Sequence, residues 1–263
     1  MGRIICIANQ KGGVGKTTTA VNLPACLAVA GHAVLLVDID PQGSASSGVC
    51  VRVLSDAPTV YDVLMGETPV DEAIRAQTPE CLHLLPAHRD LVGADLELVS
   101  ALAREFRLAE ALKTVRDRYE MIVIDCPPSL GLLTVNGLTA ADEVLIPLQC
   151  EYYALEGLTA LMETVDLIRK RLNPRLALAG ILLTMFDTRN SLSHQVADEV
   201  RKHFPRQVYE TVIPRNVRIS ESPSHGLPVV TYDPASRGAQ AYTELAREIM
   251  RPRTDEPATD TPA

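Results

Sequence analysis

The sequence lacks several features that mark other classes of protein. Only 4% of its 263 residues are aromatic although 46% are hydrophobic, so Ala, Val, Leu and Ile must build the core, as is usual for helices packed on a parallel sheet. The six cysteines form no CxxC pair and no grouping with histidine at zinc spacing, which argues against a structural zinc site. We therefore expect reduced, structural thiols in a cytosolic protein.

Long apolar runs and an excess of positive charge are also lacking. No apolar run approaches the ~20 residues that cross a bilayer. The first strand pattern starts almost at once, so we expect neither a membrane partner nor a signal peptide. The formal net charge of −8 would repel nucleic acid unless basic side chains gather locally. These absences predict a cytoplasmic protein in which any nucleic-acid site is a local basic patch.

Short apolar runs that alternate with helical patterns make up most of the chain. The expected strands are 3–8, 33–40, 81–87, 121–129, 143–149, 177–186 and 207–214, and the expected helices are 17–31, 60–66, 155–172, 191–204 and 236–251, with one or two more in 91–118. The alternation predicts an α/β fold with a single doubly wound, mostly parallel sheet and helices on both faces. Pro24 within the first helix pattern predicts a kink or a late helix start. Residues 1–251 should form one domain, followed by a disordered tail at 252–263.

The first expected strand runs directly into KGGVGKTTT, residues 11–19. Residues 15–17 fill the end of the phosphate-binding pattern GxxxxGKS/T between a strand and a helix, but Gln10 stands in place of its first glycine. The pair Gly12–Gly13 supplies the flexibility instead, so that backbone N–H groups can turn toward phosphate oxygens. The N-terminus of the following helix adds partial positive charge. The stretch therefore predicts a nucleotide site.

Two side chains of this loop have expected roles toward ATP. Lys16 should reach the β- and γ-phosphates, and the Thr17 hydroxyl should bind Mg²⁺. The loop residues expected to contact the nucleotide are Lys11, Gly12, Gly13, Val14, Gly15, Lys16, Thr17 and Thr18.

The stretch KGGVGKT, whose first lysine is Lys11, is the deviant form of the Walker A motif. With it the chain resembles the ParA/Soj family of chromosome- and plasmid-partitioning ATPases, within the wider group that includes MinD. Further stretches that resemble this family are DIDPQG (38–43), DCPPSLG (125–131), QCEYYALEG (149–157), TMFDTRNSLSHQV (184–196) and VIPRNVRISESPSHG (212–226). The resemblance covers roughly residues 2–250 and implies a P-loop NTPase fold. It also implies that Lys11 reaches the partner's phosphates across an ATP-bound homodimer, where a cation in trans stabilises charge on the transferring phosphoryl group.

Several acidic and polar residues follow the ends of expected strands, where open α/β sheets place their ligands. Asp38 and Asp40 could both be plain capping or turn residues. The resemblance implies that Asp40 orients or activates the attacking water, and that Asp125 is the Walker B carboxylate, holding Mg²⁺ directly or through water. It further implies that Pro214 and Asn216 contact adenine, although a strand-terminating turn there is an alternative.

Basic side chains gather in residues 189–218, which carry six basic and three acidic residues in a chain of net charge −8. Composition alone leaves open a solvated charged face. The resemblance implies that Arg189 and Arg218 contact the DNA backbone in the dimer, without reading base sequence. The family often continues SHGKP where this chain has Leu227, so DNA binding is expected either to be weaker or to rely more on Arg215 and Arg218.

The resemblance thus implies a DNA-partitioning ATPase with slow basal hydrolysis that a ParB-type partner protein accelerates. The ATP-bound homodimer would hold non-specific double-stranded DNA at the nucleoid, and hydrolysis would release it to drive chromosome or plasmid segregation. One alternative is a MinD-like membrane-cycling regulator, against which the acidic, proline-broken tail argues. Another is a small-molecule ATP-dependent enzyme of the same fold, such as an amidase or carboxylase, in which the basic residues of 189–218 would have no obvious use.

Overall fold

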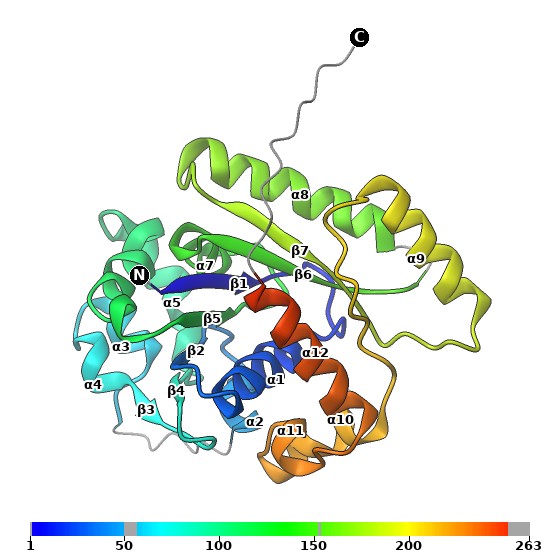
Figure 1. Ribbon diagram of the computed structural model, residues 1–263. Helices are drawn as coiled ribbons and strands as arrows, with labels where there is room; N and C mark the ends of the chain where they lie inside the picture. Colours follow the sequence, from blue (N-terminus) through cyan, green and yellow to red (C-terminus); the bar gives the residue numbers. More distant parts are fainter. Residues whose placement is uncertain (1, 50–56, 152–153, 252–263) are drawn as a thin grey trace.

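A central sheet organises the molecule in the computed structural model, which describes residues 2–49, 57–151 and 154–251. Seven strands of the described residues pair in the order β3-β4-β2-β5-β1-β6-β7 (Figure 1). Their bounds are β1 Arg3–Ile7, β2 Val34–Asp38, β3 Arg75–Ala76, β4 Leu82–Leu85, β5 Met121–Asp125, β6 Glu143–Gln149 and β7 Ala177–Thr184. All pairs are parallel except the short β3–β4 pair. The predicted α/β fold with a mostly parallel sheet is confirmed. The tail expected at 252–263 lies outside the described residues.

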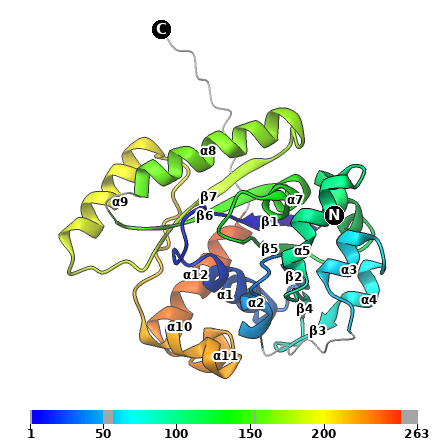
Figure 2. The same cartoon turned by 180° about the vertical axis from the view of Figure 1, so that it is seen from behind.

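Helices cover both faces of this sheet, as two opposite views show (Figures 1 and 2). The α-helices are α1 Lys16–Val29, α2 Ser44–Gly48, α3 Val60–Met65, α4 Val70–Ala73, α5 Leu91–Glu97, α6 Arg107–Lys113, α7 Leu132–Ala140, α8 Ala154–Arg171, α9 Ser191–His203, α10 Val217–Glu221, α11 Val229–Tyr232 and α12 Arg237–Met250. Short 3-10 turns are η1 Leu98–Ser100, η2 Arg104–Phe106, η3 Arg116–Arg118 and η4 Ser222–His225. None of the described helices combines the length and apolar character that crossing a bilayer requires.

Each central strand sends alternate side chains into two separate cores. Ile5 and Ile7 pack with α1, α2, α11 and α12 on one face, whereas Ile4 and Cys6 pack with α3 and α5–α9 on the other. This alternation follows from the two-residue period of a strand. Because both faces are covered, the strands are apolar throughout, which is why they stood out in the sequence.

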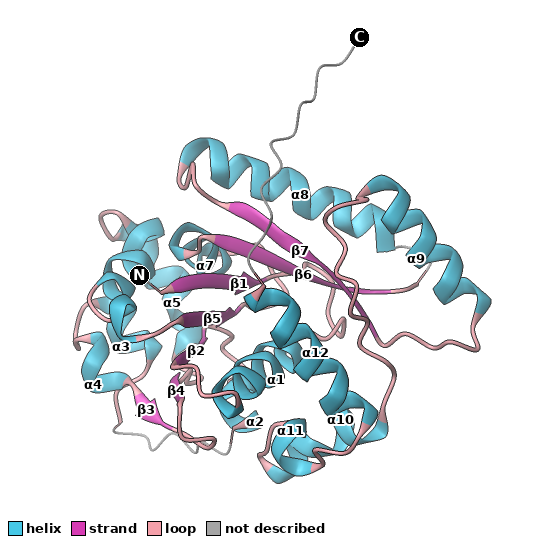
Figure 3. Ribbon diagram, in the orientation of Figure 1, coloured by secondary structure: helices cyan, strands magenta, loops and turns pink. Residues whose placement is uncertain are grey.

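The strand expected at 207–214 does not form. This segment runs beside β7 but makes only isolated parallel bridges, of Val208 with Ile181 and of Pro214 with Phe186 (Figure 3). Between these bridges the backbone N–H groups of Glu210 and Thr211 donate to the Glu248 carboxylate, at 2.7 and 3.0 Å. A side chain of α12 thus takes the Thr211 donor, which a continuous ladder with β7 would use.

Two further expectations about helices need correction. Helix α1 begins at Lys16 and continues through the buried Pro24 to Val29, so the late start is wrong. Helix α7 was not expected at all. Its sequence, LLTVNGLTA, is buried on nearly all sides and therefore has no polar stripe to reveal a helical period.

Candidate functional site

The loop between β1 and α1 has a closed side and an open side. Gly13 and Gly15 adopt positive φ, at 75° and 90°, a conformation that glycine reaches without steric cost. A Cβ added at Gly12 or Gly13 would meet nothing within 4 Å, whereas Val14 is buried and its carbonyl accepts a hydrogen bond from Thr184 Oγ1 at 2.8 Å. The loop is therefore anchored on its apolar side and leaves a backbone cradle facing open space, as a phosphate requires.

A second anchor fixes the start of this loop. Asn9 Nδ2 donates to the carbonyl of Pro147 at 2.7 Å, and Asn9 Oδ1 accepts from the backbone N–H of Lys11 at 3.0 Å. The sequence analysis missed both Asn9 and Thr184. Only Asn9 carried a signal, as a polar residue directly between a buried strand and the glycine loop.

Lys16 lies inside the cradle. It is buried, and its Nζ donates to the carbonyl of Lys11 at 3.0 Å. Burial lowers the pKa of Lys16, while the carboxylates of Asp125 and Asp40 act in the opposite direction. Gly15, the N-cap of α1, provides no side-chain cap, so the first N–H groups of the helix are available to an anion.

Lys11 points to the rim of the loop and is exposed. Its Nζ forms an ion pair with Glu151 Oε2 at 2.7 Å, and the other carboxylate oxygen accepts from Gln149 Nε2 at 2.6 Å. The sequence analysis gave Glu151 no role, although it lies in a stretch that resembles the family. Within one chain, then, the two lysines of the loop have different surroundings: Lys16 is enclosed, and Lys11 is held at the surface.

Asp38 and Asp125 are direct neighbours in the β2–β5 register. Asp38 accepts hydrogen bonds from Asp40 N at 3.1 Å and from the N–H and hydroxyl of Ser46 at 2.8 and 2.7 Å. Burial raises its pKa to about 6. Asp38 therefore takes the capping and turn role. Asp40 is 7% exposed, and its Oδ1 accepts from Gln42 N at 2.9 Å.

Asp125 has a different environment. Both of its carboxylate oxygens are buried, and neither has a hydrogen-bond partner among the described residues. Burial and the neighbouring Asp38 raise its pKa well above the usual range, whereas the nearby Thr17 hydroxyl, which lies outside good hydrogen-bond geometry, and the charge of Lys16 lower it. A buried carboxylate without donors is costly unless a cation compensates it. The described residues contain no group of three or more His, Cys, Asp or Glu side chains that could hold a metal. The arrangement fits Mg²⁺ that takes part of its coordination from phosphate and water.

The residues expected at the adenine are already used locally. Asn216 is the N-cap of α10, where its Oδ1 accepts from Arg218 N at 2.9 Å and from Ile219 N at 3.4 Å. Pro214 forms the isolated bridge with Phe186. These contacts match the turn alternative, and contact with adenine stays a prediction.

The three expected DNA-binding arginines are all exposed. Arg189 pairs with Asp187, with Nη2 and Oδ2 3.0 Å apart, and Arg215 is near enough to help lower the pKa of the Asp187 carboxyl. Arg218 pairs with Glu221 at 2.9 Å and with Asp233 at 3.2 Å. Arg215 makes no ion pair with a described residue, so it is the freest of the three cations.

Comparison with known proteins extends these observations to the whole chain. A family model described as an AAA domain matches residues 2–178. The sporulation initiation inhibitor protein Soj of Bacillus subtilis is 57% identical over 95% of this chain and 98% of its own. The chromosome partitioning protein ParA of Myxococcus xanthus is 55% identical over 95% of this chain and 89% of its own. A solved cobyrinic acid a,c-diamide synthase of Mycobacterium smegmatis, with bound ADP and magnesium, has a TM-score of 0.82 and 38% identity over 94% of this chain and 93% of its own.

Proposed function

The chain belongs to the ParA/Soj family of chromosome-partitioning ATPases, and from this premise we propose that it is a DNA-binding switch. ATP and Mg²⁺ close two copies into a homodimer, the dimer holds non-specific double-stranded DNA at the nucleoid, and hydrolysis releases it. The observation that carries the proposal is the two-lysine loop beside a buried carboxylate without a donor, Asp125.

The loop and its neighbours divide the work of hydrolysis. Backbone N–H groups at residues 12–17 bind the phosphates, and Lys16 neutralises charge on the β- and γ-oxygens. Thr17 and Asp125 would hold Mg²⁺, which would supply positive charge against the negative charge of the phosphates. Asp40, whose carboxylate is near enough to raise the pKa of Lys16, orients the attacking water and accepts its proton.

Lys11 links the bound nucleotide to dimerisation. Its ion pair with Glu151 is exposed on both sides, with 43% and 47% of the side chains accessible. Such surface pairs contribute roughly 0–1 kcal/mol. Lys11 can therefore leave Glu151 at little cost when a partner's phosphate is offered across the dimer, where its charge is worth more.

The DNA-binding part of the proposal depends on a few cations. Arg189, Arg215 and Arg218 are exposed on the loop before α9 and around the start of α10. A dimer doubles this set, so affinity should rise with dimerisation and fall with salt. A ParB-type partner protein then accelerates the slow basal hydrolysis and sets the time of release.

The small-molecule alternative is favoured by one observation, because the mycobacterial structure is named for an amide synthase. That protein is 38% identical, whereas the Soj and ParA relatives are 57% and 55% identical over nearly the whole chain. The exposed arginines have a use in the DNA switch and none in the alternative. The MinD-like alternative depends on a C-terminal membrane helix, and residues 252–263 lie outside the described part of the chain.

Sedimentation velocity tests the switch. The Asp40→Ala variant should bind ATP without hydrolysing it, and should sediment as a dimer with ATP and Mg²⁺ and as a monomer with ADP. Adding Lys11→Ala should retain nucleotide binding but remove the dimer, and Lys16→Ala should remove both. A monomer for Asp40→Ala with saturating ATP would contradict the proposal.

A further inference from the structure

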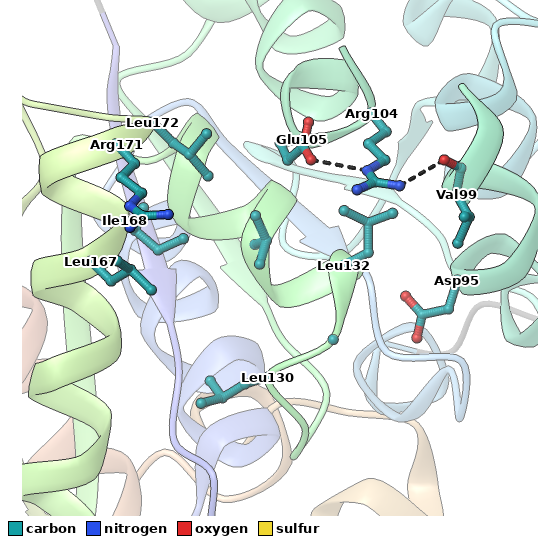
Figure 4. Close-up of a pocket in the computed structure, with 12 residues that line it drawn as sticks. Asp95, Val99, Arg104, Glu105, Leu130, Leu132, Leu167, Ile168, Arg171 and Leu172 are labelled. Atoms are coloured by element: carbon teal, nitrogen blue, oxygen red, sulfur yellow. Dashed lines mark hydrogen bonds and ion pairs between the residues drawn. The ribbon is translucent and has the colours of Figure 1, made fainter. Parts of the chain in front are cut away.

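An open groove of about 590 Å³ lies on the face of the sheet opposite α1 (Figure 4). The start of α7 forms its floor, α8 forms one wall, and the segment from α5 to η2 forms the other. The apolar side chains lining it include Val99, Leu130, Leu132, Leu167, Ile168 and Leu172. None of these residues belongs to the nucleotide site or to the set of exposed arginines, Arg189, Arg215 and Arg218.

Exposed apolar side chains continue from the groove onto the surface. Leu96, Val99 and Leu102 are 80%, 58% and 89% exposed, and they follow one another at intervals of three residues along α5 and η1. Leu167 on the opposite wall is 49% exposed. Large aliphatic side chains gathered around a groove in this way indicate a surface that binds another macromolecule.

The groove contains charged side chains that lack an ion-pair partner among the residues that the structure describes. Arg104 is already satisfied, since it donates to Glu105 Oε1 at 3.0 Å and to the carbonyl of Val99 at 2.6 Å. Asp95 is not, because the residue is half-buried, and its buried Oδ1 has no hydrogen-bond partner among the described residues. On the opposite wall, Arg171 makes no ion pair within the described part of the chain. Asp95 and Arg171 thus present an unpaired negative and an unpaired positive charge across an apolar floor (Figure 4).

We propose that this groove docks an amphipathic helix of a partner protein. Apolar side chains at i, i+3, i+4 and i+7 would cover Leu132 and Leu167 on the floor and wall. A lysine or arginine at one edge of that helix would pair with Asp95, and an aspartate or glutamate at the other edge would pair with Arg171. The inference rests on the proposed function, because the partner is the ParB-type protein that accelerates hydrolysis.

The floor of the groove, α7, packs against residues next to the nucleotide site. A partner bound in the groove could therefore change hydrolysis, as an activator does. Gly131 is the N-cap of α7 and lies against Asp95, whose Oδ2 would be 3.0 Å from a Cβ there. At the middle of α7, Gly137 packs so closely on Cys126 that a Cβ would lie 2.9 Å from the Sγ atom. Cys126 directly follows Asp125. A helix that presses on the start of α7 can therefore shift the carboxylate expected to hold Mg²⁺.

Partner binding and partner-stimulated hydrolysis test the groove. The probe is the full-length ParB-type protein of the same organism, titrated against wild type, Val99→Glu and Leu167→Glu with ATP, Mg²⁺ and DNA. Both positions are exposed, so folding should be retained. Val29→Glu is the matched control, since Val29 is also 58% exposed but lies on α1, on the other face of the sheet.

We expect Val99→Glu and Leu167→Glu to weaken partner affinity at least tenfold and to lose stimulation, with basal hydrolysis and DNA binding unchanged. Val29→Glu should behave as wild type. If the partner stimulates wild type and both groove variants equally, the groove inference is overturned while the proposed function stands. If the partner does not bind wild type at all, the proposed function loses its activator and this inference fails with it.

Charge reversal tests the orientation of the helix. Asp95→Lys should weaken partner binding about tenfold, and replacing one basic residue of the partner by glutamate should restore it. Restoration by none of the partner's basic residues would overturn the pairing with Asp95. A change in self-association of Val99→Glu without the partner would show that the groove is a contact between copies of this chain, and would also overturn the inference.

Discussion

Lys16 and Asp125 are both ionisable side chains that burial pushes toward their neutral forms. Burial lowers the pKa of the lysine and raises that of the aspartate. Asp38, which is equally buried, accepts three hydrogen bonds, whereas Asp125 has no partner of this kind among the described residues. ATP and Mg²⁺ would add further opposite charge beside Lys16 and Asp125, so nucleotide binding and the stability of this region should be linked.

Asp187 forms an ion pair with Arg189 and would compete with DNA for this arginine under the proposed function. The guanidinium beside it lowers the pKa of the Asp187 carboxyl to about 2, so the aspartate is ionised throughout the range from pH 6 to 8. We expect Asp187→Asn to raise the affinity of the ATP-bound protein for DNA about two- to fivefold, as an exposed ion pair is released, equally at pH 6 and pH 8. The measurement is a DNA-binding isotherm at each pH.

Asp198→Asn is the matched control for this change. Asp198 is 81% exposed on α9 and lies 4.0 Å from Arg201, so the substitution alters net charge by the same amount away from Arg189. An equal gain for both variants would mean that net charge alone acts, and would remove Arg189 from the DNA site.

Helix α7 connects the nucleotide site with the groove through close packing at one glycine. A Cβ at Gly137 would lie 2.9 Å from Cys126 Sγ and 3.1 Å from Ile39 Cδ1. We expect Gly137→Ala to lower the free energy of unfolding by about 1–3 kcal/mol, because overpacking outweighs the gain in helix propensity. Chemical denaturation with ATP absent would measure it.

Gly157 in α8 gives the comparison, because a Cβ there would meet nothing within 4 Å. Gly157→Ala should stabilise the protein by about 0.5–1 kcal/mol through helix propensity alone. Stabilisation of similar size in both variants would contradict the packing described for α7.

At the scale of elements, the sequence predicted what depends on local pattern. The central strands are continuous apolar runs, and α9 and α12 have a polar face, so both kinds of element were recognisable. Helix α7 was missed because it is buried on nearly all sides. The segment 207–214 has a strand's composition, but Glu248, 37 residues beyond Thr211, takes the donor of that residue. A contact of that range leaves no local signal.

The residues of the candidate site also divide into those that a local motif predicts and those that only tertiary contacts bring to the site. Lys16 and Thr17 could be predicted because the phosphate loop is a local motif. Asn9, Glu151 and Thr184 fix that loop or its lysine through tertiary contacts, and the sequence analysis gave them no role. The contacts of these residues form only once β6 lies beside β1 and β7 beside β6.

At the scale of the whole molecule, the cations proposed to bind DNA and the groove proposed to bind a partner lie apart. Figures 1 and 2 place α9 and α10 on one side of the molecule and α5 and α7 on the other. Both α7 and the loop that bears Lys16 pack around the carboxyl ends of the central strands. The two proposals together predict that DNA and a docked helix can be bound at once.

The most direct test of the switch is fluorescence anisotropy of a random-sequence DNA duplex titrated with this protein. It is measured with ATP and Mg²⁺ and with ADP and Mg²⁺, each at two salt concentrations. The account predicts binding with ATP alone, weakened at least tenfold by a fourfold rise in salt, since a dimer contacts several phosphates. Equal binding with both nucleotides, or none with either, would contradict it, and absence of binding would favour the small-molecule enzyme.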